Sequence, residues 1–252
     1  MIKLFKNIRR NLLNKGKTTK YFKYAIGEIV LVVIGILIAL QINDWNDNRK
    51  TTNSEIKTLY QLNIDLKSNL SEISQILEDN IKANELGKKI LSHLDSKEQI
   101  TDSLKFWVEK FSDINFFNNA NTTYKNIQNN NKSSITNDSL RLRITLMYER
   151  DFDNIRKREQ VLNEEYFKPY AAELNKNFKT SPSVSKSFKN IELEVNTPNN
   201  LGQLKANEYY KNVLIGVYNF RVLRIEWLTE TITKLINLIK GVELEIENLR
   251  TS

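Results

Sequence analysis

The longest apolar run in the chain lies near its N-terminus and has the length of a membrane span. Residues 29–40 are apolar throughout, and the stretch from Tyr24 to Ile42 counts 19 residues. An α-helix needs about 20 apolar residues to cross a hydrocarbon core of about 30 Å. Aromatic residues, which favour the membrane–water interface, stand on both sides of the run: Tyr21, Phe22, Tyr24 and Trp45. We therefore predict a transmembrane helix over residues 24–43, with Trp45 as an interfacial anchor.

Two alternatives to a membrane anchor fit this run less well. A core helix of a soluble protein normally has a polar face, and residues 29–40 have none. A cleaved signal peptide usually has an apolar region of about 7–15 residues that ends in a small-x-small cleavage site. This run is longer, and it ends in Ala39-Leu40-Gln41, whose last residue is not small. We therefore expect an uncleaved anchor.

Beyond the membrane segment, apolar positions recur at helical spacing in several stretches. A polar stretch, residues 46–53, comes first, and the next helix has apolar positions at seven-residue intervals. Short polar residues that cap helix N-termini precede two of the later stretches. The predicted helices cover about residues 54–94, 104–111, 122–129 and 138–177.

Proline marks two irregular places. Pro169 lies inside the second long helix, where it removes one backbone donor and crowds the preceding turn, so we expect a kink there. Pro182 and Pro198 lie in a stretch rich in Ser, Lys and Asn. We predict that residues 179–203 form a loop, with a short extended piece at 188–195.

The C-terminal segment has the most regular pattern. Ile at one core position and Leu at the other is typical of parallel two-stranded coiled coils. Ile236 and Leu238 widen the apolar face, which favours packing inside a bundle of several helices. We favour an antiparallel bundle within one chain and keep a dimeric coiled coil as the alternative. Two sets of residues recur every seven positions: Ile225, Ile232, Ile239 and Ile246, and Leu228, Leu235, Val242 and Leu249.

The predicted fold class is all-α: one N-terminal transmembrane helix followed by an elongated helical bundle with long, coiled-coil-like helices. The chain has only 7 Gly and 3 Pro among 252 residues. Many short strands would need more turn residues than these, so the composition agrees with long helices. The chain has no Cys, which excludes disulfides and thiolate chemistry.

The positive charge is concentrated at one end of the chain. The net charge is +8, and residues 1–23 contain 8 of the 38 basic residues and no acid, so the other 30 basic residues face 30 acids. A nucleic-acid-binding domain would carry its excess charge on the folded body. Basic residues before an apolar segment instead keep the N-terminus in the cytoplasm. We predict a cytoplasmic segment 1–23, a transmembrane helix 24–43 and an extracytoplasmic domain 44–252 in the inner (cytoplasmic) membrane, with no nucleic-acid partner.

Residues 2–13 fit two descriptions equally well. Apolar residues fall near helical spacing with basic residues between them, which is typical of a helix lying on an anionic membrane leaflet. A flexible basic tail that only sets the topology is the alternative. The apolar residues are Ile2, Phe5, Ile8 and Leu12.

The membrane segment contains candidate contacts with a second helix. Gly27, Leu31, Gly35 and Ala39 share one helix face, and Gly35-x-x-x-Ala39 is a small-x-x-x-small pair that allows close approach of another helix. Glu28 lies one turn inside the apolar segment, where a carboxylate is costly. It can reach the headgroup layer or pair with a nearby Lys. The alternative is that it pairs with a partner or handles an ion.

No catalytic, cofactor or metal site is predicted. Metal sites in helical bundles need Glu-x-x-His pairs or clusters of His and Cys. The single His, His93, has no acid three or four residues before it. Phosphate-binding loops need closely spaced Gly, and no two of the seven Gly lie closer than eight residues. We expect no enzyme and no cofactor.

An Asn-rich region, residues 115–131, is a candidate recognition loop. It contains Phe116, Phe117 and Tyr124, and loops held on rigid helices often carry binding function. The alternative is that Asn only tolerates turns and left-handed backbone.

The N-terminal third resembles a family of uncharacterised single-pass membrane proteins of the Bacteroidota. The resemblance rests on residues 23–46, KYAIGEIVLVVIGILIALQINDWN, with a Gly-Glu step and a Gln-x-Asn-x-Trp exit. A weaker match covers Thr123–Ile127 and Asn137–Arg141. There the family tends to have Ser-Ser-Gly, where this chain has Asn129-Asn130-Asn131. The resemblance implies the anchor topology and a helical exported domain, and it brings no known activity.

Three functional hypotheses follow. The first is a membrane-anchored interaction or scaffold protein of the cell envelope, whose partners are the lipid bilayer and another envelope or membrane protein or a second copy of itself. The second is an extracytoplasmic ligand sensor that signals through a membrane partner. The third is an accessory subunit of an energised membrane complex that uses Glu28.

Overall fold

The computed structural model describes residues 18–97, 99, 102–129, 134–183 and 192–251. The predicted amphipathic segment 2–13 and the last two residues of the Asn-rich region, Asn130 and Asn131, lie outside these residues.

The membrane segment and the first long helix form one continuous helix, α2, from Thr18 to Asp95. The polar stretch 46–53, which we expected to separate them, is helical. Its polar side chains satisfy one another along the helix: Asp47 accepts hydrogen bonds from Asn43 and Lys50, and the Thr51 hydroxyl donates to the Asp47 carbonyl oxygen at 2.9 Å. Such pairs three and four residues apart stabilise a helix without burial.

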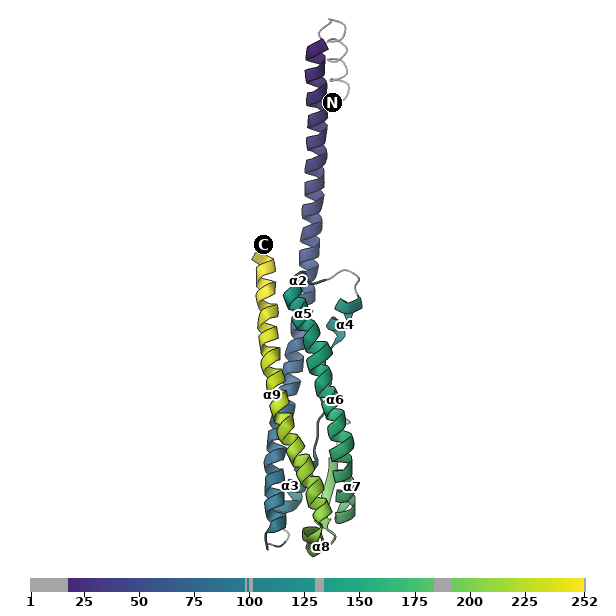
Figure 1. Ribbon diagram of the computed structural model, residues 1–252, viewed down its shortest axis with the longest axis vertical. Helices are drawn as coiled ribbons and strands as arrows, with labels where there is room; N and C mark the ends of the chain where they lie inside the picture. Colours follow the sequence, from purple (N-terminus) through teal and green to yellow (C-terminus); the bar gives the residue numbers. More distant parts are fainter. Residues whose placement is uncertain (1–17, 98, 100–101, 130–133, 184–191, 252) are drawn as a thin grey trace. The chain divides into compact units, whose positions relative to one another are not determined.

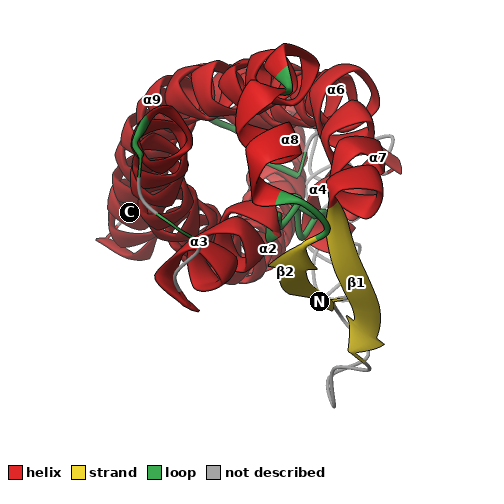
Figure 2. Cartoon of the chain, turned by 90° about the horizontal axis from the view of Figure 1, so that it is seen from below, coloured by secondary structure: helices red, strands yellow, loops and turns green. Residues whose placement is uncertain are grey.

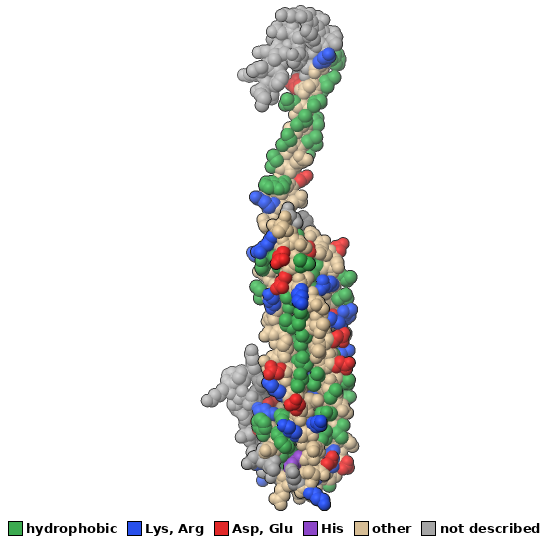
Figure 3. Space-filling model, turned by 90° about the vertical axis from the view of Figure 1, so that its left-hand side faces the viewer, with side chains coloured by type: hydrophobic (Ala, Val, Ile, Leu, Met, Phe, Trp, Pro, Cys, Tyr) green, Lys and Arg blue, Asp and Glu red, His purple; other side chains and the backbone are tan. Residues whose placement is uncertain are grey.

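Contacts divide the chain into two compact units, of which the first ends at Glu55 and the second begins at Ile56. In the first unit the described residues are the N-terminal part of α2. Large apolar side chains from Ile29 to Leu40 are between 47% and 64% exposed there. Figure 3 shows these hydrophobic side chains on the face that it displays. By length and composition, this is the one candidate membrane span among the described residues.

The second unit is a helical bundle with one small hairpin (Figure 1). It contains α2 from Ile56 onward and the elements α3 (Asp102–Ser112), α4 (Thr122–Asn129), α5 (Asp138–Leu146), η1 (Met147–Phe152), α6 (Asp153–Val161), η2 (Leu162–Phe167), α7 (Lys168–Asn177), β1 (Phe178–Ser183), β2 (Glu192–Pro198), α8 (Leu201–Ala206) and α9 (Glu208–Thr251). The all-α fold class is confirmed.

Three long helical paths build this bundle, and α9 runs antiparallel to the other two. Along α2, Asn63 contacts Glu243 and Asn80 contacts Arg221, so the α9 numbers fall as the α2 numbers rise. The path from α5 to α7 shows the same order against α9: its pairs with α9 are Asn137–Glu245, Arg143–Asn237, Asp151–Lys234 and Glu159–Arg224.

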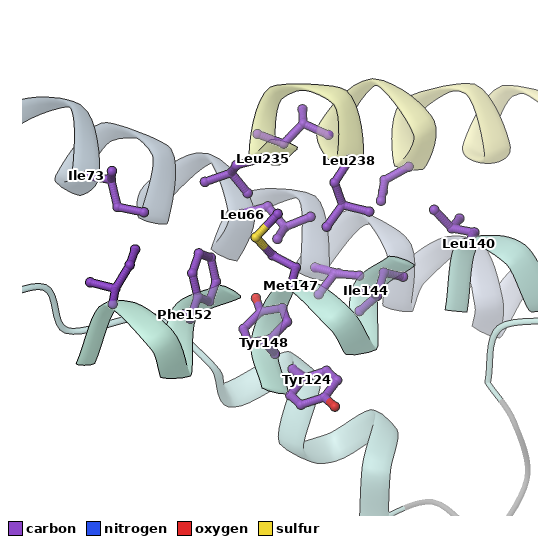
Figure 4. Packing of buried hydrophobic residues seen from close by; sticks show 14 of the residues in the cluster. Leu66, Ile73, Tyr124, Leu140, Ile144, Met147, Tyr148, Phe152, Leu235 and Leu238 are labelled. Carbon is purple, nitrogen blue, oxygen red and sulfur yellow. The ribbon is translucent and has the colours of Figure 1, made fainter. Parts of the chain in front are cut away.

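The apolar stripe of the C-terminal helix is buried inside the chain. Leu228, Leu235 and Val242 are fully buried, and they pack with α2 and with the α5–η1 region in one hydrophobic cluster. Figure 4 shows Leu235 and Leu238 facing Leu66, Met147 and their neighbours. The stripe is therefore part of the core of a bundle within one chain. We favoured this arrangement over a dimeric coiled coil. A second cluster, around Phe111, Tyr170 and Tyr210, fills the part of the bundle near α3, α7 and the start of α9.

The second long helix contains two π-helical stretches, η1 and η2. The prediction of one helical path over about 138–177 is confirmed, and Asn137 caps its N-terminus by accepting a hydrogen bond from the Leu140 backbone at 3.0 Å. Pro169 is the second residue after η2, and the Lys168 backbone between them donates to the Asn163 carbonyl five residues earlier. The structure therefore has a widened turn just before the proline, and the kink expected at Pro169 stays a prediction.

The loop prediction for residues 179–203 was wrong in part. Strands β1 and β2 pair antiparallel, with Thr180 opposite Val195 and Ser183 opposite Glu192, and the short helix α8 follows. Figure 2 shows the hairpin at the side of the bundle. The hairpin was not predicted because proline, here Pro182 and Pro198, is rare in strands. Proline is nevertheless tolerated at the edge or the end of a strand.

Candidate functional site

The five site residues singled out from the sequence lie on the first unit's part of α2. Gly27, Gly35 and Ala39 are exposed, and Glu28 is half-buried. A Cβ atom added at Gly27 or Gly35 would meet nothing within 4 Å. Trp45 is 65% exposed, and the Arg49 guanidinium lies 5.3 Å from its ring centroid. The predicted contacts of Gly27, Glu28, Gly35 and Ala39 with a partner helix remain a prediction.

The helical glycines of the bundle differ from those of the membrane segment. A Cβ at Gly87 would lie 2.5 Å from Phe111, one at Gly216 would lie 3.2 Å from Tyr166, and one at Gly241 would lie 2.8 Å from Arg143. Each of these three glycines therefore has a close neighbour in the same chain. The described residues offer no such neighbour for Gly27 and Gly35.

The irregular segment between α3 and α4, residues 113–121, is held along its length by polar side chains; we call it the strap. The Asn69 side chain of α2 bonds to Ala120 twice, donating to its carbonyl at 3.0 Å and accepting from its N–H at 2.6 Å. Glu72 accepts from the Asn118 N–H at 3.0 Å. These bonds supply the partners that backbone groups outside regular structure need.

Two buried arginines of α9 hold the start of the strap, and Arg221 is the first. Its guanidinium donates to the carbonyl oxygens of Phe111 and Asp113, both at 2.8 Å, and to the Asn80 side-chain oxygen at 3.0 Å. These carbonyls lie at the C-terminus of α3, where helix carbonyls lack partners and the helix dipole is negative. Burial lowers the pKa of Arg221 to about 9, so the group remains charged at neutral pH.

Arg224, one turn further along α9, forms a buried ion pair with Glu159 of α6. The second carboxylate oxygen of Glu159 accepts from the Phe117 N–H at 2.9 Å, and Arg224 also donates to the Asn115 carbonyl. Burial raises the pKa of Glu159, and the neighbouring guanidinium opposes this change. The pair therefore connects α6, α9 and the strap.

An open pocket of about 190 Å³ lies where the strap, α4 and η1 meet. π-helical turns often occur at functional sites because they change the direction of side chains within a helix. This pocket is the candidate ligand site of the bundle. Its lining residues are Asn119, Asn121, Tyr124, Lys125, Gln128, Tyr148, Glu149, Phe152, Asp153 and Arg156.

A stacked tyrosine pair and a fixed carboxylate form one side of the pocket. The ring centroids of Tyr124 and Tyr148 lie 4.4 Å apart, and the two rings are nearly parallel. Figure 4 shows both side chains beside the hydrophobic cluster. The Tyr124 hydroxyl and the Gln128 amide both donate to the same Glu149 oxygen, at 3.0 and 2.8 Å. Burial, together with the bond to Glu149, raises the pKa of Tyr124 to about 12.

The sequence predicted the location of this site in part. The Asn-rich region 115–131 does contribute to the pocket through Asn119, Asn121 and Tyr124, but its described backbone is fixed by bonds to the bundle. The two buried arginines were missed. One signal was present: Arg221 stands seven residues before Leu228, at a position of the apolar stripe.

The lone histidine has a structural environment. His93 is 5% exposed, and its ring meets the Trp107 ring edge-on at 6.3 Å between centroids. Among the described residues, no three His, Cys, Asp or Glu side chains are grouped so that they could hold a metal ion.

Comparison with known protein families identifies a family for this chain. A family model described as a family of unknown function (DUF6090) matches residues 28–216, which is well over half of the chain. The match includes the strap, α4 and every residue that lines the pocket. No curated protein and no solved structure matches the chain.

Proposed function

Because this chain belongs to DUF6090, a family of unknown function, we propose a role from its own residues: a membrane-anchored helical interaction or scaffold protein of the cell envelope. Its partners are the lipid bilayer and another envelope or membrane protein or a second copy of itself. We also propose that residues 23–46 are a membrane segment characteristic of the family in the Bacteroidota.

The observation that carries the proposal is the exposed apolar surface of α2 from Ile29 to Leu40. Ten large apolar side chains in this stretch are about half exposed or more, on every side of the helix. Contiguous apolar surface of this kind marks contact with a membrane or another protein. A helix that is apolar all round and has the length of a bilayer core fits a membrane span.

The charge distribution supports an orientation. Residues 1–23 carry eight basic residues and no acid, and the rest of the chain is formally neutral. Basic residues flanking a span are retained on the cytoplasmic side. We place the protein in the inner membrane with residues 44–252 outside the cytoplasm.

The open space at Gly27 and Gly35 supports association through the membrane helix. In the bundle, a helical glycine can allow a side chain of another helix to approach the backbone closely, as Gly87 does for the Phe111 ring. Small residues serve the same purpose between transmembrane helices. We therefore expect a second helix to pack closely on the face formed by Gly27, Leu31, Gly35 and Ala39, where the small side chains leave room for it.

Cysteine crosslinking in native membranes tests this association, because the chain has no other Cys. Ala39→Cys lies on the small-residue face, and Val33→Cys on the opposite side of the helix is the matched control. We expect oxidation to give a disulfide-linked dimer at least fivefold more abundant for Ala39→Cys. Adding Gly35→Leu to Ala39→Cys should return the yield to that of the control.

Equal crosslinking of the two single-Cys variants contradicts self-association through this face. A photocrosslinker at position 39 that captures one different membrane protein, and fails to do so in Gly35→Leu, supports the same face with a different partner. Capture of neither kind contradicts the proposed function.

A further inference from the structure

The pocket at the strap, α4 and η1 has walls that are fixed before any ligand arrives. Asn119 and Asn121 flank Ala120, whose N–H and carbonyl are both bonded to Asn69. The Thr123 N–H donates to Asp65 at 3.1 Å, which fixes the start of α4. A preorganised wall lowers the cost of ordering side chains on binding.

The pocket is small and open, so it favours a ligand of about one ring without enclosing it. Its volume is about 190 Å³, whereas pockets for drug-sized ligands begin at roughly 300 Å³. A peptide or a nucleotide would extend beyond it.

The charges that line the pocket cancel. Lys125 and Arg156 are balanced by Glu149 and Asp153. Asp153 is already paired with two cations, Arg156 and Lys157. A ligand with a net charge of either sign would therefore meet like charges as well as opposite ones. The lining gives no net attraction to either sign, which favours an uncharged ligand.

The remaining groups combine hydrogen-bonding side chains with two aromatic residues, Tyr148 and Phe152, which we call the aromatic base. The two residues are 6% and 2% exposed, and they line the pocket with the small accessible parts of their rings. The two Asn amides offer both donors and acceptors. One Glu149 oxygen is held by Tyr124 and Gln128, which fixes the direction of the carboxylate and of its second oxygen. Sugar rings have this combination of hydroxyl groups around the edge and an apolar C–H face.

We propose that this pocket binds a neutral polyhydroxylated molecule the size of one sugar ring. The hydroxyl groups bond to Glu149, Asn119, Asn121 and Gln128, and the ring lies toward the aromatic base. This binding goes beyond the interaction role and does not depend on it.

Saturation-transfer NMR on the full chain tests the proposal. The protein is held in lauryldimethylamine oxide micelles, because detergents with sugar headgroups would compete. The probes are D-glucose, D-galactose and N-acetyl-D-glucosamine, with acetate and methylammonium as negatively and positively charged controls. We expect saturation transfer from the protein to at least one sugar and to neither control.

Variants place the binding in this pocket. Glu149→Gln and Asn121→Ala should each weaken the dissociation constant at least tenfold, and Glu247→Gln, on the exposed face of α9, should leave it unchanged. Near-ultraviolet circular dichroism checks the fold, and Asn121→Ala serves if Glu149→Gln proves unfolded. Gly35→Leu should leave sugar binding intact, which separates this result from the association test.

Three results overturn the proposal. The first is no saturation transfer to any of the three sugars. The second is undiminished sugar binding in a folded Glu149→Gln or Asn121→Ala protein. The third is stronger transfer to acetate or methylammonium than to the sugars, which would assign the pocket to charged ligands.

Discussion

At the scale of single residues, two buried arginines of α9 hold the strap and α6 against the rest of the bundle. Arg221 and Arg224 are each 1% exposed and lie in an otherwise apolar helix face. A buried charge is costly unless it is paired and hydrogen-bonded. Arg221 meets this requirement with neutral carbonyls at the end of α3 and with Asn80, and Arg224 meets it with Glu159.

Replacing Arg221 by Met should lower the free energy of unfolding by about 3 kcal/mol, because it leaves two buried carbonyls and the Asn80 side chain without their donor. Arg156→Met is the control. Arg156 is 71% exposed in its ion pair with Asp153, and exposed pairs contribute about 0–1 kcal/mol. Urea unfolding of the full chain in detergent measures both. Equal stabilities of the two variants would refute the capping role of Arg221.

The Tyr124 hydroxyl should contribute stability that depends on pH. Its pKa in the folded protein, about 12, lies above its ordinary value of 10.0. The contribution is therefore fully present below pH 10 and is lost as the pH rises through 12. Tyr124→Phe should cost about 1 kcal/mol at pH 8, and the difference from the unmodified protein should shrink toward pH 12. Unfolding curves at several pH values measure it, and a difference that stays constant with pH would contradict the assignment.

The sequence predicts where a candidate site lies but not how its side chains are arranged. The Asn-rich region and Tyr124 were visible as candidates. The acceptors of Arg221 are backbone carbonyls near the end of α3, and their position depends on how α3 packs against α9. No local pattern encodes such a contact.

At the scale of elements, close packing between helices explains the glycines of the bundle. Gly87 of α2 faces the Phe111 ring of α3, which is itself enclosed by Tyr170 and by the Arg221 guanidinium. The ring therefore has no room to move away from an added methyl group.

Gly87→Ala should destabilise the bundle by about 2 kcal/mol, because overpacking costs about 1–3 kcal/mol and outweighs the better helix propensity of Ala. Gly35→Ala is the matched change, since a Cβ there meets nothing within 4 Å. It should leave the unfolding of the bundle unchanged. Near-ultraviolet circular dichroism during urea unfolding compares the two. A stabilised Gly87→Ala protein would show that the Phe111 ring can move away from the added methyl group.

The helices were predictable because apolar spacing reports burial directly. The stripe through Leu228, Leu235 and Val242 is buried as its period requires. The continuity of α2 through residues 46–53 was missed because that stretch buries little and is supported by side-chain pairs around Asp47. The hairpin and the π-helical turns were missed because both depend on tertiary context.

At the scale of the whole molecule, the proposed topology separates a basic N-terminal segment from the exported bundle. The absence of Cys makes single engineered thiols specific reporters of side. Glu247→Cys, on the exposed face of α9, should react with a membrane-impermeant maleimide in intact spheroplasts. Lys6→Cys should react only after lysis. Labelling of Lys6→Cys in intact spheroplasts with protection of Glu247→Cys would reverse the orientation.

The two π-helical turns have a consequence for how the length of this chain can vary. A π-turn holds one residue more than an α-turn, so removing one residue from η1 or η2 can restore an α-turn while the flanking helices keep their faces. The same deletion inside α9 would rotate every later side chain by about 100° and move its buried stripe to the surface. Among related chains, single-residue gaps should therefore gather at 147–152 and 162–167 and be rare in the apolar stripe of α9.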